Sequence, residues 1–432
     1  MCDSFVALPT ATTTGTTLAA KNADCEINEA QAVLHLPRRR YPEGATLRAT
    51  HIVIPQARET HEVLLDKSFW TWGGEIGLNE HGLAVGNEAI FSNAAERQDG
   101  LITGDLLRLM LERAKTCEEA VEVFTQALER FGQGGNCELR GNAHFDSSYL
   151  VSDLSSAVVI ETAGRHWVVR PVDGVGAISN AMTIGGDWER CSSGLPGTGN
   201  LGRIDFQARF EDMAKVAAAG SRQRHGVAQS WLEKHRGHID LRCMADLLRQ
   251  HGDGYDPTEG EVCTNICMHA GPYPSRFWQA CGAMIMDAGP KGSMAWVTAT
   301  SGTCVSIFKP VYFGATMPDT GPTPREIFTE GSLWWRHELL HRRAMADFHT
   351  LGQEIRADFE RLEEGFFAEG RSLIAAPARE KTEFMEQCWR RAAEATDRWI
   401  GLLERRNTGY RHKGYAALWD RFDRAAAMPS VQ

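Results

Sequence analysis

The sequence has no long apolar run and no concentration of positive charge. No stretch of about 18 consecutive apolar residues occurs among the 432 residues, so a membrane-spanning helix is not expected. The first residues lack the basic and then apolar segments of a secretory signal. The net charge is -10 and no basic stripe is present, which argues against a nucleic-acid surface, because phosphate binding needs clustered Lys and Arg. We expect a cytoplasmic protein with neither a membrane nor a nucleic acid as partner.

A disulfide framework is also missing. The eleven cysteines are an odd number, scattered along the chain, as in proteins of a reducing compartment, where thiols persist. Cys263 and Cys267 form a C-x3-C pair with no matching second pair, which disfavours a structural zinc site built on that spacing. We therefore expect no metal and no cofactor, and we interpret most of the cysteines as small core residues.

The most informative stretch is the N-terminal one, Met1-Cys2. Removal of Met1 would leave a cysteine that carries a thiol and a free α-amine on one residue. The reference pKa values of the two groups are about 8 for the amine and about 8.5 for the thiol, so the amine can accept the thiol proton at neutral pH. Such a residue is a nucleophile with its own base. The alternative is that a cysteine at position 2 has no role in a flexible terminus.

The residues after Cys2 carry a family resemblance. Two apolar clusters separated by a Thr-rich turn, Phe5–Pro9 and Leu18–Ala20, predict a β-hairpin that fixes the terminus in a sheet. The stretches Cys2–Ala7 and Lys21–Asp24 resemble the Cys-Asp-(Ser/Thr)-Phe-Val-Ala and Lys-Asn-Ser-Asp-Arg motifs of the secernin and dipeptidase branch of cysteine-type N-terminal-nucleophile hydrolases. The second motif is broken at Ala23 and at Cys25, which stands where the family has arginine.

The resemblance implies roles for four further residues. Asp24 would orient the terminus, the backbone N–H of Asn87 and the side chain of Asn180 would form the oxyanion hole, and Arg276 would lie near the nucleophile. From the residues alone, Asn180 is better explained as a cap or turn residue, and Arg276 is equally well explained as a surface cation. The candidate substrate-binding residues are Asn22, Trp72, His269 and Tyr273, and a core role for the aromatic residues near Tyr273 stays open.

The order of apolar patterns predicts an α+β fold. Alternating runs typical of strands precede and follow two helical segments between residues 103 and 130, and helical spacing returns between residues 202 and 250. Thr116 is the predicted N-cap of the second helix. Two antiparallel sheets between helical layers account for this order, and the resemblance implies the four-layer αββα sandwich of N-terminal-nucleophile hydrolases. We expect this domain over residues 1–330 and a helical C-terminal extension over residues 331–432, which packs on the sandwich or on a second subunit in a homo-oligomer.

One motif points to different chemistry. His337, Glu338 and His341 satisfy H-E-x-x-H, which in zinc hydrolases places two imidazoles and a general base on one helical face. The preceding residues, from Leu333 on, resemble a helix start of the secernins instead.

The expected activity is hydrolysis of a C–N amide bond in a dipeptide or acyl-amino acid, with Cys2 as nucleophile through a thioester and no metal. The alternatives are a non-catalytic, secernin-like adaptor and, less favoured, a zinc hydrolase that uses His337, Glu338 and His341.

Overall fold

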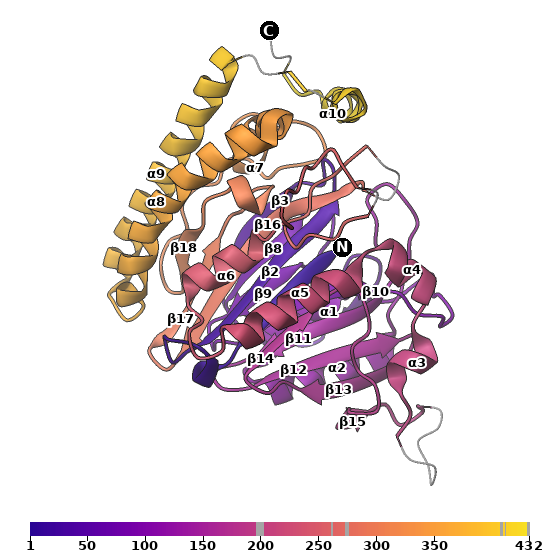
Figure 1. The fold of residues 1–432 in the computed structure, drawn as a ribbon. Helices are drawn as coiled ribbons and strands as arrows, with labels where there is room; N and C mark the ends of the chain where they lie inside the picture. Colours follow the sequence, from indigo (N-terminus) through magenta and orange to yellow (C-terminus); the bar gives the residue numbers. More distant parts are fainter. Residues whose placement is uncertain (196–202, 261, 273–275, 407–408, 411, 430–432) are drawn as a thin grey trace.

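Two stacked antiparallel sheets form the centre of the protein (Figure 1). The computed structural model describes residues 1–195, 203–260, 262–272, 276–406, 409–410 and 412–429. The strands of the first sheet are, in spatial order, β14 (Val175–Ile178), β1 (Cys2–Ala7), β2 (Thr17–Glu26), β16 (Trp278–Gly289), β17 (Gly292–Val297) and β18 (Lys309–Tyr312).

The second sheet has eight strands and packs face to face on the first, with β1 against β10 and β11 and β16 against β8 and β9. Its strands are, in spatial order, β15 (Arg190–Cys191), β13 (His166–Pro171), β12 (Ala157–Ala163), β11 (Asp146–Ser152), β10 (Ala84–Ile90), β9 (Ile76–Asn79), β8 (Val63–Ser68) and β3 (Gln31–Leu36). Two short ribbons pair β4 (Arg39–Arg40) with β7 (Glu59–Thr60) and β5 (Thr46–Arg48) with β6 (Val53–Pro55).

Helices cover the outer face of each sheet. The eight-stranded sheet is covered by α1 (Thr103–Arg113) and α2 (Cys117–Phe131), and the six-stranded sheet by α5 (Ser221–Lys234) and α6 (Leu241–Leu248). Two short helices, α3 (Phe206–Phe210) and α4 (Met213–Ala218), precede α5. As predicted, the Thr116 side chain caps α2 by accepting a hydrogen bond from the Glu119 N–H. The predicted four-layer α+β arrangement is confirmed.

The C-terminal residues are helical and pack on the six-stranded sheet of the same chain. Helices α8 and α9 lie beside the edge strand β18 (Figure 1), and Phe366 and Trp389 belong to the hydrophobic core shared with that sheet. The helices are α7 (Leu333–Ala344), α8 (Gln353–Gly370), α9 (Ala378–Arg406) and α10 (Lys413–Ala425). Short turns of 3-10 or π helix lie at η1 (Pro9–Ala11), η2 (Thr303–Val305), η3 (Met345–Asp347), η4 (Phe348–Gly352) and η5 (Arg371–Leu373). No helix in the described part of the chain has the length and apolar character needed to span a membrane.

The N-terminal residues lie in the middle of this architecture. Strand β1 pairs with β14 on one side and with β2 on the other, with Cys2 opposite Ala23 and Asp3 opposite Asn22. The predicted hairpin is therefore present, although β2 continues to Glu26, so Asn22 and Asp24 lie within the strand and not beyond it. All six residues of β1 are buried, so the start of the chain has a fixed position.

Candidate active site around Cys2

The Cys2 side chain faces a cavity of about 310 Å³. Its Sγ accepts a hydrogen bond from the Asp24 backbone N–H at 3.3 Å, and the Cys2 backbone N–H donates to Asn180 Oδ1 at 2.8 Å. The amino group of Met1 donates to the Asp24 carbonyl oxygen at 3.1 Å. Both the nitrogen and the sulfur of Cys2 are thus held by hydrogen bonds in the cavity wall.

The cavity wall combines aromatic rings with acidic side chains. The aromatic residues on the wall are Trp70, Phe91, Phe145, Phe277 and Trp278. The acidic ones are Asp24, Glu29, Glu75 and Glu138, and Lys215 is a basic residue of the same wall. Glu29 accepts hydrogen bonds from Ser68 Oγ and from the Trp70 indole N–H. The cavity therefore offers an apolar volume beside a group of carboxyl side chains.

Burial shifts the pKa values of the carboxyl groups around Cys2 upward. Burial raises the pKa of Asp24 to about 8, and the N-terminal amine opposes this shift. Both Asp24 carboxylate oxygens lack a hydrogen-bond partner among the described residues. Burial likewise raises the pKa of Glu88 to about 8 and that of Asp66 to about 7. These groups hold protons near neutral pH, because low-dielectric surroundings disfavour the charged form.

Lys21 lies among these carboxyl groups and is fully buried. Its ammonium is 3.7 Å from Glu75 Oε2. Burial alone would lower the Lys21 pKa, but Cys2, Glu75 and Glu88 raise it above its ordinary value. Burial raises the pKa of the Cys2 thiol to about 11, while Lys21 and the N-terminal amine act to lower it. Lys21 therefore favours the thiolate over the thiol.

Arg224 of α5 connects the residues that hold the terminus. Its guanidinium is fully buried and donates to Asp3 Oδ2 at 2.9 Å, to Ser179 Oγ at 3.1 Å and to Asn180 Oδ1 at 2.6 Å. Since a guanidinium only donates hydrogen bonds, the atom of Asn180 that it contacts is the carbonyl oxygen. The same oxygen accepts from the Cys2 N–H, so Arg224 orients Asn180 toward the terminus.

Three of the predicted catalytic residues reach the cavity with Cys2, namely Asp24, Asn87 and Asn180. The Asn180 Nδ2 donates to the Ala89 carbonyl oxygen at 2.7 Å, and its Oδ1 accepts from the Cys2 N–H. An amide NH2 carries two hydrogens, so Oδ1 positions the terminus while the second Nδ2 hydrogen stays a candidate oxyanion donor. Asn87 Nδ2 donates to the Gly74 carbonyl oxygen at 3.3 Å.

Arg276 does not lie on this wall. Its guanidinium donates to the backbone carbonyl oxygens of Pro257, Gly260 and His269, and it lines a separate cavity. Those carbonyl groups satisfy a buried cation within the loop that follows α6, and the arginine close to Cys2 is Arg224. The predicted position of Arg276 beside the nucleophile is wrong.

Three of the predicted substrate-binding residues also lie away from the cavity. Asn22 Nδ2 donates to the Leu248 and Ile266 carbonyl oxygens, and its oxygen accepts from Thr303. Asn22 pairs with Asp3, whereas Cys2 pairs with Ala23, so the Asn22 and Cys2 side chains point to opposite faces of the sheet. Trp72 packs on the Arg108 guanidinium, 4.3 Å from the ring centroid. His269 lies in a separate cluster of side chains. Tyr273 is outside the described residues.

The H-E-x-x-H residues do not converge on a metal-binding point. His337 Nε2 is 3.1 Å from Ser306 Oγ, whereas the Glu338 carboxylate binds Arg342 and His341. Although Glu338 is buried, Arg342 and His341 hold its pKa below the ordinary value. The ion pair with Arg342 occupies the glutamate that a zinc hydrolase needs as its general base, and this disfavours the zinc hydrolase interpretation.

The sequence did not predict that Arg224, Lys21, Trp70 and Glu29 belong to this region. One signal could have identified a missing cation: Asp3 is the only charged residue of the buried strand β1, and a buried carboxylate needs a paired charge or a proton. The spacing of the sequence does not say which arginine supplies the charge.

Solved structures that resemble the chain include three hydrolases or acylases. A conjugated bile acid hydrolase from Clostridium perfringens (C2A mutant) is 13% identical, with 69% of this chain and 88% of that chain covered and a TM-score of 0.41. A penicillin V acylase from Agrobacterium tumefaciens is 12% identical, with 72% of this chain and 86% of that chain covered and a TM-score of 0.44. An N-acylethanolamine-hydrolyzing acid amidase ortholog from Caenorhabditis elegans is 14% identical, with 66% of this chain and 92% of that chain covered and a TM-score of 0.36. Among family models, the one described as acyl-coenzyme A:6-aminopenicillanic acid acyl-transferase matches residues 15–138 of this chain.

Proposed function

We propose that the chain is an N-terminal-nucleophile hydrolase that cleaves C–N amide bonds of small molecules with Cys2. The observation that carries the proposal is the placement of both reactive groups of Cys2 in the wall of one cavity. The nitrogen is held by Asn180 Oδ1 at 2.8 Å, and the sulfur faces the Asp24 N–H at 3.3 Å. Removal of Met1 converts that nitrogen into an α-amine without moving the strand that carries it.

The reaction follows from these positions. The Cys2 amine takes the thiol proton, and the thiolate attacks the carbonyl carbon of the amide to form a C–S bond. The ammonium then protonates the leaving nitrogen, the C–N bond breaks, and a thioester of Cys2 remains. Water adds to the thioester, with the amine as base, and releases the carboxylic acid and the free thiol. Asn180 positions the amine through Oδ1, and the candidate oxyanion donors are the Asn87 backbone N–H and the Asn180 Nδ2, because both residues lie on the cavity wall.

The composition of the wall favours a dipeptide-like substrate. The aromatic rings suit an apolar or aromatic side chain on the acyl residue, and Glu29 and Glu75 suit its free ammonium group. Lys215 on the same wall suits the carboxylate of the leaving amino acid. Charge complementarity of this kind orients a small zwitterion in a cavity of about 310 Å³.

A second outcome for the thioester is transfer of the acyl group to an amine instead of water. The match of residues 15–138 to an acyl-transferase model favours testing this outcome. Hydrolysis and acyl transfer share the formation of the Cys2 thioester. They differ in whether water or an amine then attacks that thioester.

The test compares the processed protein with a form that keeps an uncleavable residue ahead of Cys2. Intact-mass analysis of the processed protein should show loss of Met1, and a thiol-directed electrophile should label Cys2 before the other ten cysteines. Turnover of a dipeptide library, followed by liquid chromatography and mass spectrometry with and without an added amine acceptor, should require the free terminus. Full turnover by the blocked form would refute the mechanism, and absence of both turnover and selective labelling would support an adaptor role.

A further inference from the structure

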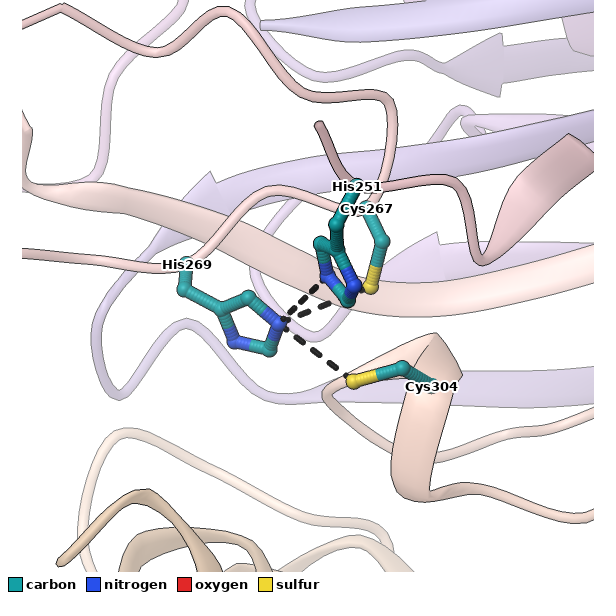
Figure 2. A group of neighbouring side chains, drawn as sticks. All are labelled: His251, Cys267, His269 and Cys304. Carbon is teal, nitrogen blue, oxygen red and sulfur yellow. Dashed lines mark hydrogen bonds between the residues drawn. The ribbon is translucent and has the colours of Figure 1, made fainter. Parts of the chain in front are cut away.

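We infer that His251, Cys267, His269 and Cys304 form a structural zinc site. Figure 2 shows the four side chains directed at one another from three separate segments. His251 follows the end of α6, Cys267 and His269 lie in the segment that leads toward β16, and Cys304 belongs to η2. One ligand atom of each residue lies within 4.8 Å of the others, which places four donors around a single point.

The distances between the donors fit a tetrahedral zinc ion. With Zn–N bonds of about 2.05 Å and Zn–S bonds of about 2.3 Å, tetrahedral angles separate two nitrogens by about 3.3 Å and a nitrogen from a sulfur by about 3.6 Å. In the structure His269 Nε2 is 3.2 Å from His251 Nε2, 3.6 Å from Cys267 Sγ and 3.4 Å from Cys304 Sγ. Two thiolates and two imidazoles are a common donor set for structural zinc.

Hydrogen bonding alone explains this cluster poorly. The single Nε2 atom of His269 approaches three polar atoms at once (Figure 2), but a neutral imidazole nitrogen either donates one hydrogen or accepts. The side chains of Cys267, His269 and Cys304 are buried, so water is a poor substitute partner. A cation between the four donors removes this conflict, because every donor then directs a lone pair at positive charge.

The surroundings suit a closed site. The Tyr255 ring stacks on His251 at 4.8 Å between centroids, and Phe348 contacts both imidazoles edge-on at 5.3 and 5.4 Å. A cavity of about 250 Å³ borders His269 and provides a route for the ion. Four protein ligands leave no position for substrate, so the ion has a structural role and not a catalytic one.

The position of the site explains what the ion stabilises. The described residues between α6 and β16 form no helix or strand, yet they supply the Cys263 carbonyl oxygen that accepts from Arg224 and Phe277, which lies on the wall of the Cys2 cavity next to Trp278 of β16. A zinc ion would fasten this segment to α6 and η2 and so fix one wall of the cavity. This inference does not depend on the proposed amide hydrolysis.

The test measures metal in protein purified without an added polyhistidine tag, in a Cys2→Ala background that removes the thiol of the other site. Elemental analysis should find about one zinc per chain. Replacement by Co²⁺ should give the near-ultraviolet thiolate charge-transfer band and the intense visible bands of tetrahedral cobalt. Removal of zinc by a chelator should lower Tm by about 5 °C or more, and added zinc should restore it.

Variants then locate the ion. Cys304→Ser and His251→Ala should each reduce zinc affinity about tenfold or more, whereas Cys117→Ser, at a buried cysteine of α2, should leave the zinc content unchanged. If Cys304→Ser does not fold, titration of the parent protein with a mercurial should release one zinc per two thiols modified. A Cys267–Cys304 disulfide in the freshly purified protein, full zinc content in Cys304→Ser, or no metal binding after zinc or cobalt loading would overturn the inference.

Discussion

Cysteine thiols occur in two very different settings in this protein, one at Cys2 and one at Cys267 and Cys304. Cys2 opens onto a cavity, next to a backbone N–H, a buried ammonium and protonated carboxyl groups. Cys267 and Cys304 are enclosed by two imidazoles and aromatic rings. A nucleophile needs space for its substrate and a proton acceptor at hand, whereas a metal ligand needs other donors at fixed distances. The neighbours of a cysteine therefore determine its chemistry more than the residue itself.

The largest effect on activity is expected when the sulfur of Cys2 is removed. Cys2→Ala should lower amide turnover at least about 10⁴-fold, and Cys2→Ser should be strongly impaired because a hydroxyl is much less acidic than a thiol. Metal content and Tm should stay close to those of the parent. Product formation and elemental analysis on one preparation measure both quantities, and Cys117→Ser is the matched control, with turnover retained. Comparable turnover in Cys2→Ala would show that the chemistry lies at another site.

The next effect tests the buried ion pair that holds the Cys2 strand. Arg224→Met should lower the free energy of unfolding by about 3–5 kcal/mol, because it leaves the Asp3 carboxylate buried without its cation. Lys234→Met removes a positive charge from the exposed side of the same helix, α5, and should change stability by less than about 1 kcal/mol. Urea denaturation measures both variants, and an Arg224→Met protein as stable as the parent would contradict the assigned ion pair. Asp3→Asn combined with Arg224→Met should recover part of the loss.

The sequence could predict the Cys2 strand but not Arg224. Strand β1 and its hairpin follow from local apolar clusters and a turn, and the helical segments follow from a period of 3.6 residues. Each of these signals is contained in a short stretch of the sequence. Arg224 contacts Asp3 and Asn180, which are far from it in the sequence, and no spacing rule connects them. The same limit applies to the zinc ligands. The C-x3-C spacing of Cys263 and Cys267 has no matching second pair, so the sequence predicted no zinc site, and no spacing rule connects Cys267 with Cys304, which the fold brings to it.

A third effect is a dependence of stability on pH. It should arise at Cys2, which is surrounded by carboxyl groups, and not at the zinc cluster, which contains none. Because the Asp24 pKa is raised from its ordinary 3.8 to about 8, the folded protein binds more protons than the unfolded chain between about pH 4 and pH 8. The free energy of unfolding therefore falls as the pH rises through this window. Asp24→Asn should be near-neutral at pH 4 and stabilising by on the order of 5 kcal/mol at pH 8, because each unit of pKa shift corresponds to about 1.4 kcal/mol.

Chemical denaturation at both pH values checks this sign. Asp173→Asn is the control, because the Asp173 side chain is exposed, and this substitution should change stability little at either pH. An Asp24→Asn protein that loses stability relative to the parent as the pH rises would show that Asp24 is ionised in the folded state.

The smallest effect distinguishes two neighbouring tryptophans. Trp70→Phe keeps an aromatic ring on the cavity wall but removes the indole N–H that donates to Glu29 at 2.8 Å, so KM for a dipeptide with a free amino group should rise about threefold. Trp72→Phe should leave KM unchanged, because Trp72 packs on Arg108 outside the cavity. Equal effects of the two substitutions in steady-state kinetics would contradict the assignment of the wall.

The central position of β1 also sets a time limit during protein synthesis. The Met1–Cys2 bond lies at the cavity wall of the folded protein, whereas an aminopeptidase needs an extended, accessible terminus. β16, which pairs with β2 beside β1, ends at Gly289, so at roughly 5–20 residues per second the ribosome needs about 15–60 s to deliver it. If Met1 is removed, we expect its excision within this interval, because the folded chain holds Met1 partly buried at the cavity wall.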